Sequence, residues 1–149
     1  LTAIKIVESS NGSNNYPRFE SGYAPANFVA TIQGRTVHGT GRNFNKVVAG
    51  RWKQYGMASA CSFSSWQILY HTAADMGFCD CPWMLWDDRI AERWVRRRLV
   101  ALESRAKTVE QYAQGWNGGH VGAKVPEYES KLRAAYDSLA PTDHATLGA

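Results

Sequence analysis

The feature that most constrains the fold is a helical spacing of apolar residues that recurs from residue 44 onward. The longest such stretch is predicted to run from Pro82 to about Ser104. Its apolar residues form two neighbouring rows, Trp83, Trp86, Ile90 and Trp94 in one and Ala91, Val95, Leu99 and Leu102 in the other. Two rows give an apolar face wide enough for a helix that lies centrally among other helices. The sequence therefore predicts a mainly α fold around one core.

Shorter segments show the same spacing, and their ends carry helix start and stop signals. A short helix over residues 1–10 is expected to stop at Asn11-Gly12. Capping-box patterns, Ser64-x-x-Gln67 and Thr108-x-x-Gln111, stand at the starts of two further helices. With these signals, the remaining helices are predicted at residues 44–55, 66–77, 108–114 and 126–139.

A long segment between the first two helices, residues 11–44, is rich in glycine and proline and is predicted to be mostly loop. Within it, Thr31–Gly39 is a candidate hairpin because β-branched residues flank Gly34. A loop of this length inside a compact domain is usually functional or mobile.

Composition excludes several classes of protein. With 149 residues, 44% of them hydrophobic and 20% charged, residues 1–149 are expected to form one folded domain, neither disordered nor fibrous. No apolar run is long enough for a membrane span. The net charge of +4 is weak support for a nucleic-acid partner, and we expect none. The histidines show no ligand spacing. We expect no metal and no cofactor.

The chain has three cysteines, an odd number, so at least one thiol is unpaired within a monomer. A bridge from Cys61 to either Cys79 or Cys81 is possible in an oxidising compartment. A row of arginines at helical spacing, Arg89, Arg93 and Arg96, either meets anionic groups or forms an ordinary solvated helix face.

Glu8 is the first candidate for chemistry, because it ends an apolar helix just before a polar loop. A carboxyl at such an edge is partly desolvated, which raises its pKa and suits it to donate a proton. Its position also opposes the helix dipole, which argues mildly against a purely stabilising role. The alternative is a solvated residue at a helix end.

Several motifs that are unspecific alone occur in a characteristic order: Glu8-Ser9, then Ser62-x-x-x-x-Gln67-Ile68, then Trp116-Asn-Gly-Gly119, and finally Tyr128-x-x-Lys-Leu. This series resembles the lytic transglycosylase and goose-type lysozyme family, whose pattern runs Glu-Ser, Ser-x-Gly-x-x-Gln, aromatic-Asn-x-Gly, and a Tyr in the final helix. The stretch from Pro17 to Tyr23 is similar to an Arg-Tyr-Glu-Pro-Gly-Tyr sequence of phage-type members. The resemblance covers nearly the whole chain.

The resemblance implies a lysozyme-like helical domain, acting as a monomer, that cleaves the MurNAc-β-1,4-GlcNAc bond of peptidoglycan glycan strands in the bacterial cell wall. Glu8 would protonate the glycosidic oxygen, and Ser9 would buttress it. The sugar would be held by four residues that line the cleft, with Trp116 beside them: Ser62, Gln67, Asn117 and Tyr128.

Three functions remain open at this point: a transglycosylase, a hydrolase and a domain that binds glycan without cleaving it. A transglycosylase needs only Glu8, as acid and then base, and closes a 1,6-anhydro ring on the muramic sugar. A hydrolase needs a second carboxylate, for which Glu20 is the best candidate, ahead of Asp75 and Asp80. Glu20 could instead be a structural residue that pairs with Arg18 or Arg42. In the third alternative, the domain binds glycan without cleaving it.

The sequence departs from the family pattern at two positions. Ser64 stands where the family has glycine, and Trp116 stands where a tyrosine is usual. We expect Ser64 to leave the fold unchanged, because serine is favourable at a helix N-cap.

Overall fold

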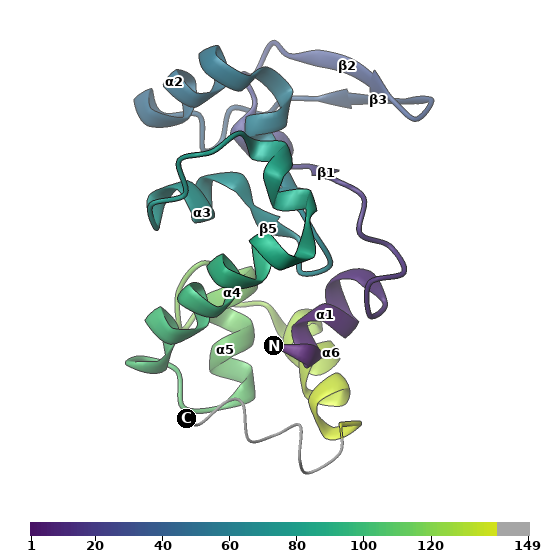
Figure 1. Ribbon diagram of the computed structural model, residues 1–149, viewed down its shortest axis with the longest axis vertical. Coiled ribbons are helices and arrows are strands. Elements are labelled where there is room, and N and C mark those ends of the chain that lie inside the picture. The colour runs from purple at the N-terminus through teal and green to yellow at the C-terminus, as the bar shows by residue number, and fades with distance from the viewer. Residues whose placement is uncertain (140–149) are drawn as a thin grey trace.

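The computed structural model describes residues 1–139 and is mainly α, as predicted (Figure 1). Its α-helices are α1 (Thr2–Ser9), α2 (Lys46–Tyr55), α3 (Tyr70–Asp75), α4 (Asp88–Glu103), α5 (Val109–Asn117) and α6 (Pro126–Asp137). The 3-10 helices are η1 (Ser21–Tyr23), η2 (Gly56–Ala60) and η3 (Pro82–Trp86). The strands are β1 (Arg18–Phe19), β2 (Val29–Ile32), β3 (Arg35–His38), β4 (Cys61–Phe63) and β5 (Ile68–Leu69).

The elements form two parts, one above the other in Figure 1. The helical base consists of α1, α4, α5 and α6; within it, α6 packs against both α1 and α5, and α4 against α5. The upper part contains the strands, α2 and α3. A single cluster of buried residues joins the two parts, from Ile4 in α1 through Ile68 in β5 to Trp116 in α5. The expectation of one apolar core is therefore met within the described residues.

Two small antiparallel sheets organise the upper part. In the first, β4 lies between β1 and β5, and its register places Arg18 opposite Ser62. In the second, β2 and β3 form the predicted hairpin, which turns at Gln33-Gly34 with positive φ at both residues. That backbone fits a two-residue hairpin turn.

The capping-box prediction at Ser64 is wrong, because helix α3 begins only at Tyr70. Ser64 and Gln67 instead belong to the loop that joins β4 to β5, and both have positive φ, 67° and 48°. Strands buried on both faces carry no alternation of apolar and polar residues, so their pattern is not distinguishable from that of a buried helix. The positive φ of Ser64 strains its backbone. A glycine would suit this position, because glycine adopts a positive φ at no steric cost.

The longest helix also begins later than predicted. Pro82–Trp86 is a 3-10 helix, and α4 starts at Asp88 with Asp87 as its N-cap, accepting a hydrogen bond from the backbone N–H of Arg89. As a result Trp83 and Trp86 are largely exposed, at 53% and 44%. The α4 face that follows is buried as predicted, through Ala91, Trp94, Val95 and Leu99.

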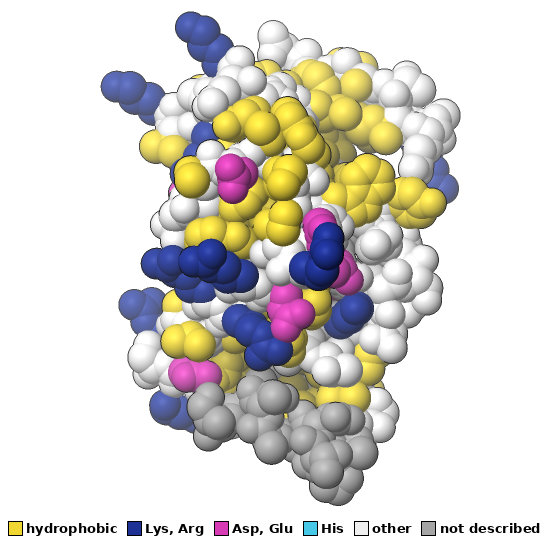
Figure 2. Space-filling model, viewed as in Figure 1, with side chains coloured by type: hydrophobic (Ala, Val, Ile, Leu, Met, Phe, Trp, Pro, Cys, Tyr) yellow, Lys and Arg dark blue, Asp and Glu magenta, His cyan; other side chains and the backbone are white. Residues whose placement is uncertain are grey.

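The arginine row of α4 is solvated and partly neutralised. Figure 2 shows basic side chains crossing the middle of this face with acidic side chains beside several of them. Arg89 pairs with Asp87 and Arg96 with Glu92, each at 2.7 Å. All three cysteines are free thiols. Across the described part of the chain, no helix has the length and apolar character that a bilayer crossing requires.

Candidate active site

A cleft of about 750 Å³ opens between the helical base and the upper part. From the base it is lined by Glu8, Arg98 and residues 116–119. The lining residues of the upper part are Arg18, residues 20–23, Thr40, Arg42, Asn43, Ser62, residues 67–69 and Thr72. The two carboxylates predicted to matter, Glu8 and Glu20, both face it. The lining is mostly polar, with hydroxyl, amide and guanidinium groups that can hydrogen-bond a polar ligand.

Glu8 is held by three side chains from distant parts of the sequence. Its Oε1 accepts hydrogen bonds from Tyr128 Oη at 2.7 Å and from Trp116 Nε1 at 3.2 Å. Its Oε2 lies 3.7 Å from Arg18 Nη1. The Glu8 side chain is only 7% exposed. Burial therefore raises the pKa of Glu8, although Tyr128, Arg18 and Trp116 favour the ionised form and oppose that rise.

The helical base explains why these groups meet. Helix α1 stops directly after Glu8-Ser9, because Ser10 adopts a left-handed conformation. Trp116 comes from the last turn of α5, and Tyr128 from the first turns of α6. The departure from tyrosine at position 116 thus has a defined effect, since an indole N–H can only donate and so is committed to the carboxylate.

Glu20 lies on the opposite wall and is also engaged. Its Oε1 accepts from Arg18 Nε at 2.9 Å and from Ser62 Oγ at 2.8 Å. Arg18 therefore stands between the two carboxylates and contacts both. Of the two arginines proposed as partners for Glu20, the structure pairs it with Arg18 and not with Arg42. The pairing of β1 with β4 brings these residues together.

Ser62 and Gln67 border the cleft, but their polar atoms are used internally. Gln67 Nε2 donates to the carbonyl oxygens of Tyr16, at 3.1 Å, and Ser64, at 3.0 Å. Its Oε1 lies 3.0 Å from the Ser62 hydroxyl. Both amide protons are thus committed to holding loops together. These hydrogen bonds brace the β4–β5 loop, and the contact of Gln67 with a sugar stays a prediction.

The remaining predicted residues divide between cleft and scaffold. Asn117 lines the cleft beside Trp116. Tyr128, which was predicted to line the cleft, is not among its lining residues, and its hydroxyl contacts Glu8. Ser9 does not touch the Glu8 carboxyl; its hydroxyl donates to Lys5 O at 3.0 Å and accepts from Gly12 N at 2.8 Å. Ser9 is buried at 2% exposure, and its hydroxyl closes the end of α1.

Two arginines are functional candidates that sequence reasoning did not select. Arg18 was considered only as a partner for Glu20, although it lies inside the motif that begins at Pro17. Arg98 is half-buried in α4, donates to the carbonyl oxygens of Gly115 and Trp116 at 2.8 and 3.1 Å, and its Cζ lies 5.4 Å from the ring centre of Trp116. Arg98 lies four residues after the buried Trp94 and therefore on the same face of the helix. This spacing is the signal that could have distinguished Arg98 from the solvated arginines.

Within residues 1–139, no cluster of three or more histidine, cysteine, aspartate or glutamate side chains could hold a metal ion. Comparison of the chain with models of protein families, with curated proteins and with solved structures gives no match.

Proposed function

We propose that this chain has a lysozyme-like fold and is a peptidoglycan-cleaving glycosidase that cuts the MurNAc-β-1,4-GlcNAc bond, with Glu8 as the proton donor. The observation that carries the proposal is the environment of Glu8: a carboxyl that is nearly buried, has a raised pKa and faces an open polar cleft. A general acid must be protonated near neutral pH and lie within reach of the leaving oxygen. Burial of Glu8 supports the first condition, and its place in the cleft wall supports the second.

The hydrogen bonds indicate which oxygen of Glu8 carries the proton. Oε1 already accepts from Tyr128 and Trp116, so the acidic proton belongs on Oε2. After the proton moves to the glycosidic oxygen, the new carboxylate keeps both hydrogen bonds and gains from the nearby Arg18 charge. Such donors stabilise charge as it develops without further reorganisation.

A transglycosylase step is our preferred form of the reaction. The muramic 6-hydroxyl attacks C1 of its own ring, the glycosidic bond breaks, and ionised Glu8 takes the hydroxyl proton. One carboxylate is enough for both proton transfers. Glu20 fits a supporting role in this scheme, because Arg18 and Ser62 both bind its Oε1 and hold it in place.

Hydrolysis is the second candidate, and one observation favours it. Glu20 faces the same cleft and its side chain remains 31% exposed, so water can reach it. An inverting hydrolase places its two carboxyls roughly 6.5–9.5 Å apart, with water between them and the sugar. In this chain, the guanidinium of Arg18 occupies the space between the two carboxylates.

Mass spectrometry of fragments released from purified peptidoglycan separates these schemes. The wild-type chain is expected to release fragments lighter by one water, ending in an anhydro sugar, and Glu8→Gln to release none. Fragments with ordinary reducing ends would instead establish hydrolysis, and loss of those fragments in Glu20→Gln would make Glu20 the water-activating base. Absence of any fragment, with glycan binding retained, would overturn the enzymatic proposal and leave a glycan-binding module.

A further inference from the structure

A second groove of about 560 Å³ continues from the cleft along the upper part. Its lining shares Tyr23, Arg42, Asn43 and Thr72 with the cleft, so a ligand in the cleft can extend into the groove without leaving the protein surface. The groove then runs between the start of α2 and helix α3. Neither Glu8 nor Glu20 lines it, so the proposed chemistry does not explain it.

The charges in the groove do not balance. Arg51 is paired, donating to Asp75 at 2.8 Å and contacting His71 Nδ1 at 3.1 Å. Arg42 is exposed and makes no side-chain ion pair or hydrogen bond with the described residues. Two guanidinium groups therefore face one carboxylate, Asp75, and the groove has an excess of positive charge. The unpaired cation stands where the groove meets the cleft.

His71 does not contribute a charge of its own. It is buried at 3% exposure, and burial together with Arg51 lowers its pKa to about 4. Because guanidinium groups only donate, His71 Nδ1 must accept from Arg51, which leaves the proton on Nε2. The ring stacks on Tyr23 with centroids 5.0 Å apart. Neutral His71 thus fixes Arg51 and the wall of the groove, and Arg42 is left as its free anion-binding group.

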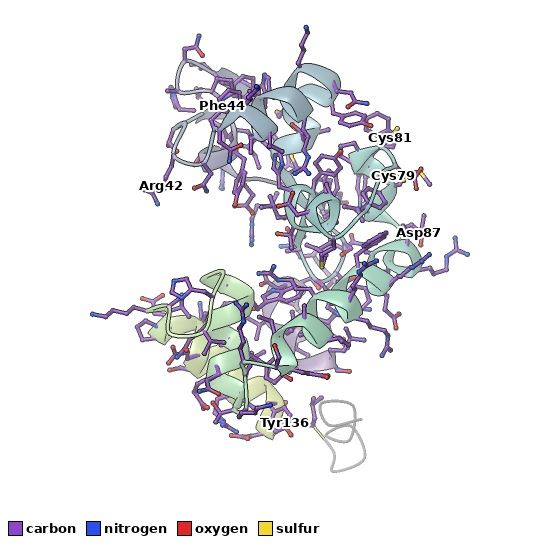
Figure 3. All side chains as sticks on the ribbon, turned by 90° about the vertical axis from the view of Figure 1, so that its left-hand side faces the viewer. Arg42, Phe44, Cys79, Cys81, Asp87 and Tyr136 are labelled. Atoms are coloured by element: carbon purple, nitrogen blue, oxygen red, sulfur yellow. The ribbon has the colours of Figure 1, made fainter. Side chains whose placement is uncertain are left out.

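Figure 3 shows Arg42 at the edge of the upper part that faces α5 and α6, on the far side from Cys79 and Cys81. This is the edge that a glycan lying in the cleft would follow. In peptidoglycan each muramic sugar carries a peptide through its lactyl group, and the peptide bears carboxylates. A plain N-acetylglucosamine polymer carries none.

We propose that this groove binds the carboxylate-bearing peptide stem of the muramic sugar, with Arg42 as the residue that pairs with it. The proposal rests on the proposed function, because it assumes that the glycan occupies the cleft. It makes the chain selective for wall glycan that still carries its peptides. Pairing is strongest where a guanidinium can offer two N–H groups to one carboxylate.

Binding is tested in the Glu8→Gln background, so that the ligands stay intact. One ligand is a MurNAc-containing disaccharide with its peptide stem; the other is the same disaccharide without peptide and with its lactyl carboxyl amidated. Isothermal titration is expected to show at least about tenfold tighter binding of the stem-bearing ligand, which corresponds to about 1.4 kcal/mol. Adding Arg42→Gln should abolish most of that ratio.

Arg35→Gln is the matched control, since Arg35 is exposed on β3 and lines neither the cleft nor the groove. It should leave the affinity ratio unchanged. Equal affinity for the two ligands, or an unchanged ratio in Arg42→Gln, overturns the groove proposal. If the wild-type chain nevertheless cleaves whole peptidoglycan, only this inference fails; if it neither cleaves nor binds either ligand, the proposed function fails with it.

Discussion

Replacing Tyr128 with phenylalanine removes the shortest hydrogen bond to Glu8 and leaves the ring in place. The Tyr128 hydroxyl lies 2.7 Å from Glu8 Oε1 and favours the ionised carboxylate. A hydrogen bond to a charged group contributes about 1.5–3 kcal/mol. The hydroxyl also contacts the neutral acid, so we expect Tyr128→Phe to destabilise the ionised carboxylate by an amount at the lower end of this range, which raises the pKa of Glu8 further.

The pH dependence of kcat/KM on peptidoglycan measures this shift. A general acid works only while it is protonated, so activity declines as the pH rises above its pKa. In Tyr128→Phe the decline should therefore occur at higher pH than in the wild type. Tyr112→Phe is the control, since Tyr112 lies in the core of α5 and outside the cleft. If the pH at which kcat/KM declines is the same in Tyr128→Phe as in the wild type, or lower, the view that Tyr128 stabilises the ionised form of Glu8 is refuted.

Other substitutions test the same structure by different measurements. The pKa of Glu8 is raised in the folded chain, so ionisation of Glu8 lowers the free energy of unfolding as the pH rises through the folded-state pKa. At pH 7, Glu8→Gln should therefore unfold at a higher urea concentration than the wild type, and this difference should vanish below about pH 4. Ser64→Gly relieves a left-handed backbone and should stabilise the fold by about 1 kcal/mol, seen as a Tm rise of about 2–4 °C; a fall in Tm would mean that the buried hydroxyl matters more. Arg98→Lys loses the planar contact with Trp116 and should lower the free energy of unfolding by about 1–2 kcal/mol, whereas no change in denaturant midpoint would contradict that reading.

Local patterns were sufficient for the helices that bury one face. The segments that became α1, α5 and α6 were identified from apolar spacing, and the β2–β3 hairpin from the residues around Gly34. The same reasoning failed at Ser64, because a serine followed three residues later by a glutamine suits a helix start and a tight loop equally well. Only the burial of β4 and β5 against the rest of the core decides between the two.

The candidate site was predictable in its residues but not in its contacts. Glu8, Trp116 and Tyr128 could be named from motif order, and they do meet. The position of Arg18 between two carboxylates depends on strand pairing with Ser62, 44 residues away, and no local pattern encodes that register. The same long-range pairing explains why Gln67 turned out to be committed to neighbouring loops.

The supports of Glu8 lie 108 and 120 residues further along the chain. During synthesis, α1 therefore leaves the ribosome long before the indole and phenol that complete its environment exist. Until α5 and α6 dock, Glu8 is a solvated carboxyl on a short and marginally stable helix. The buried environment that raises the pKa of Glu8 therefore exists only once α5 and α6 have docked on α1.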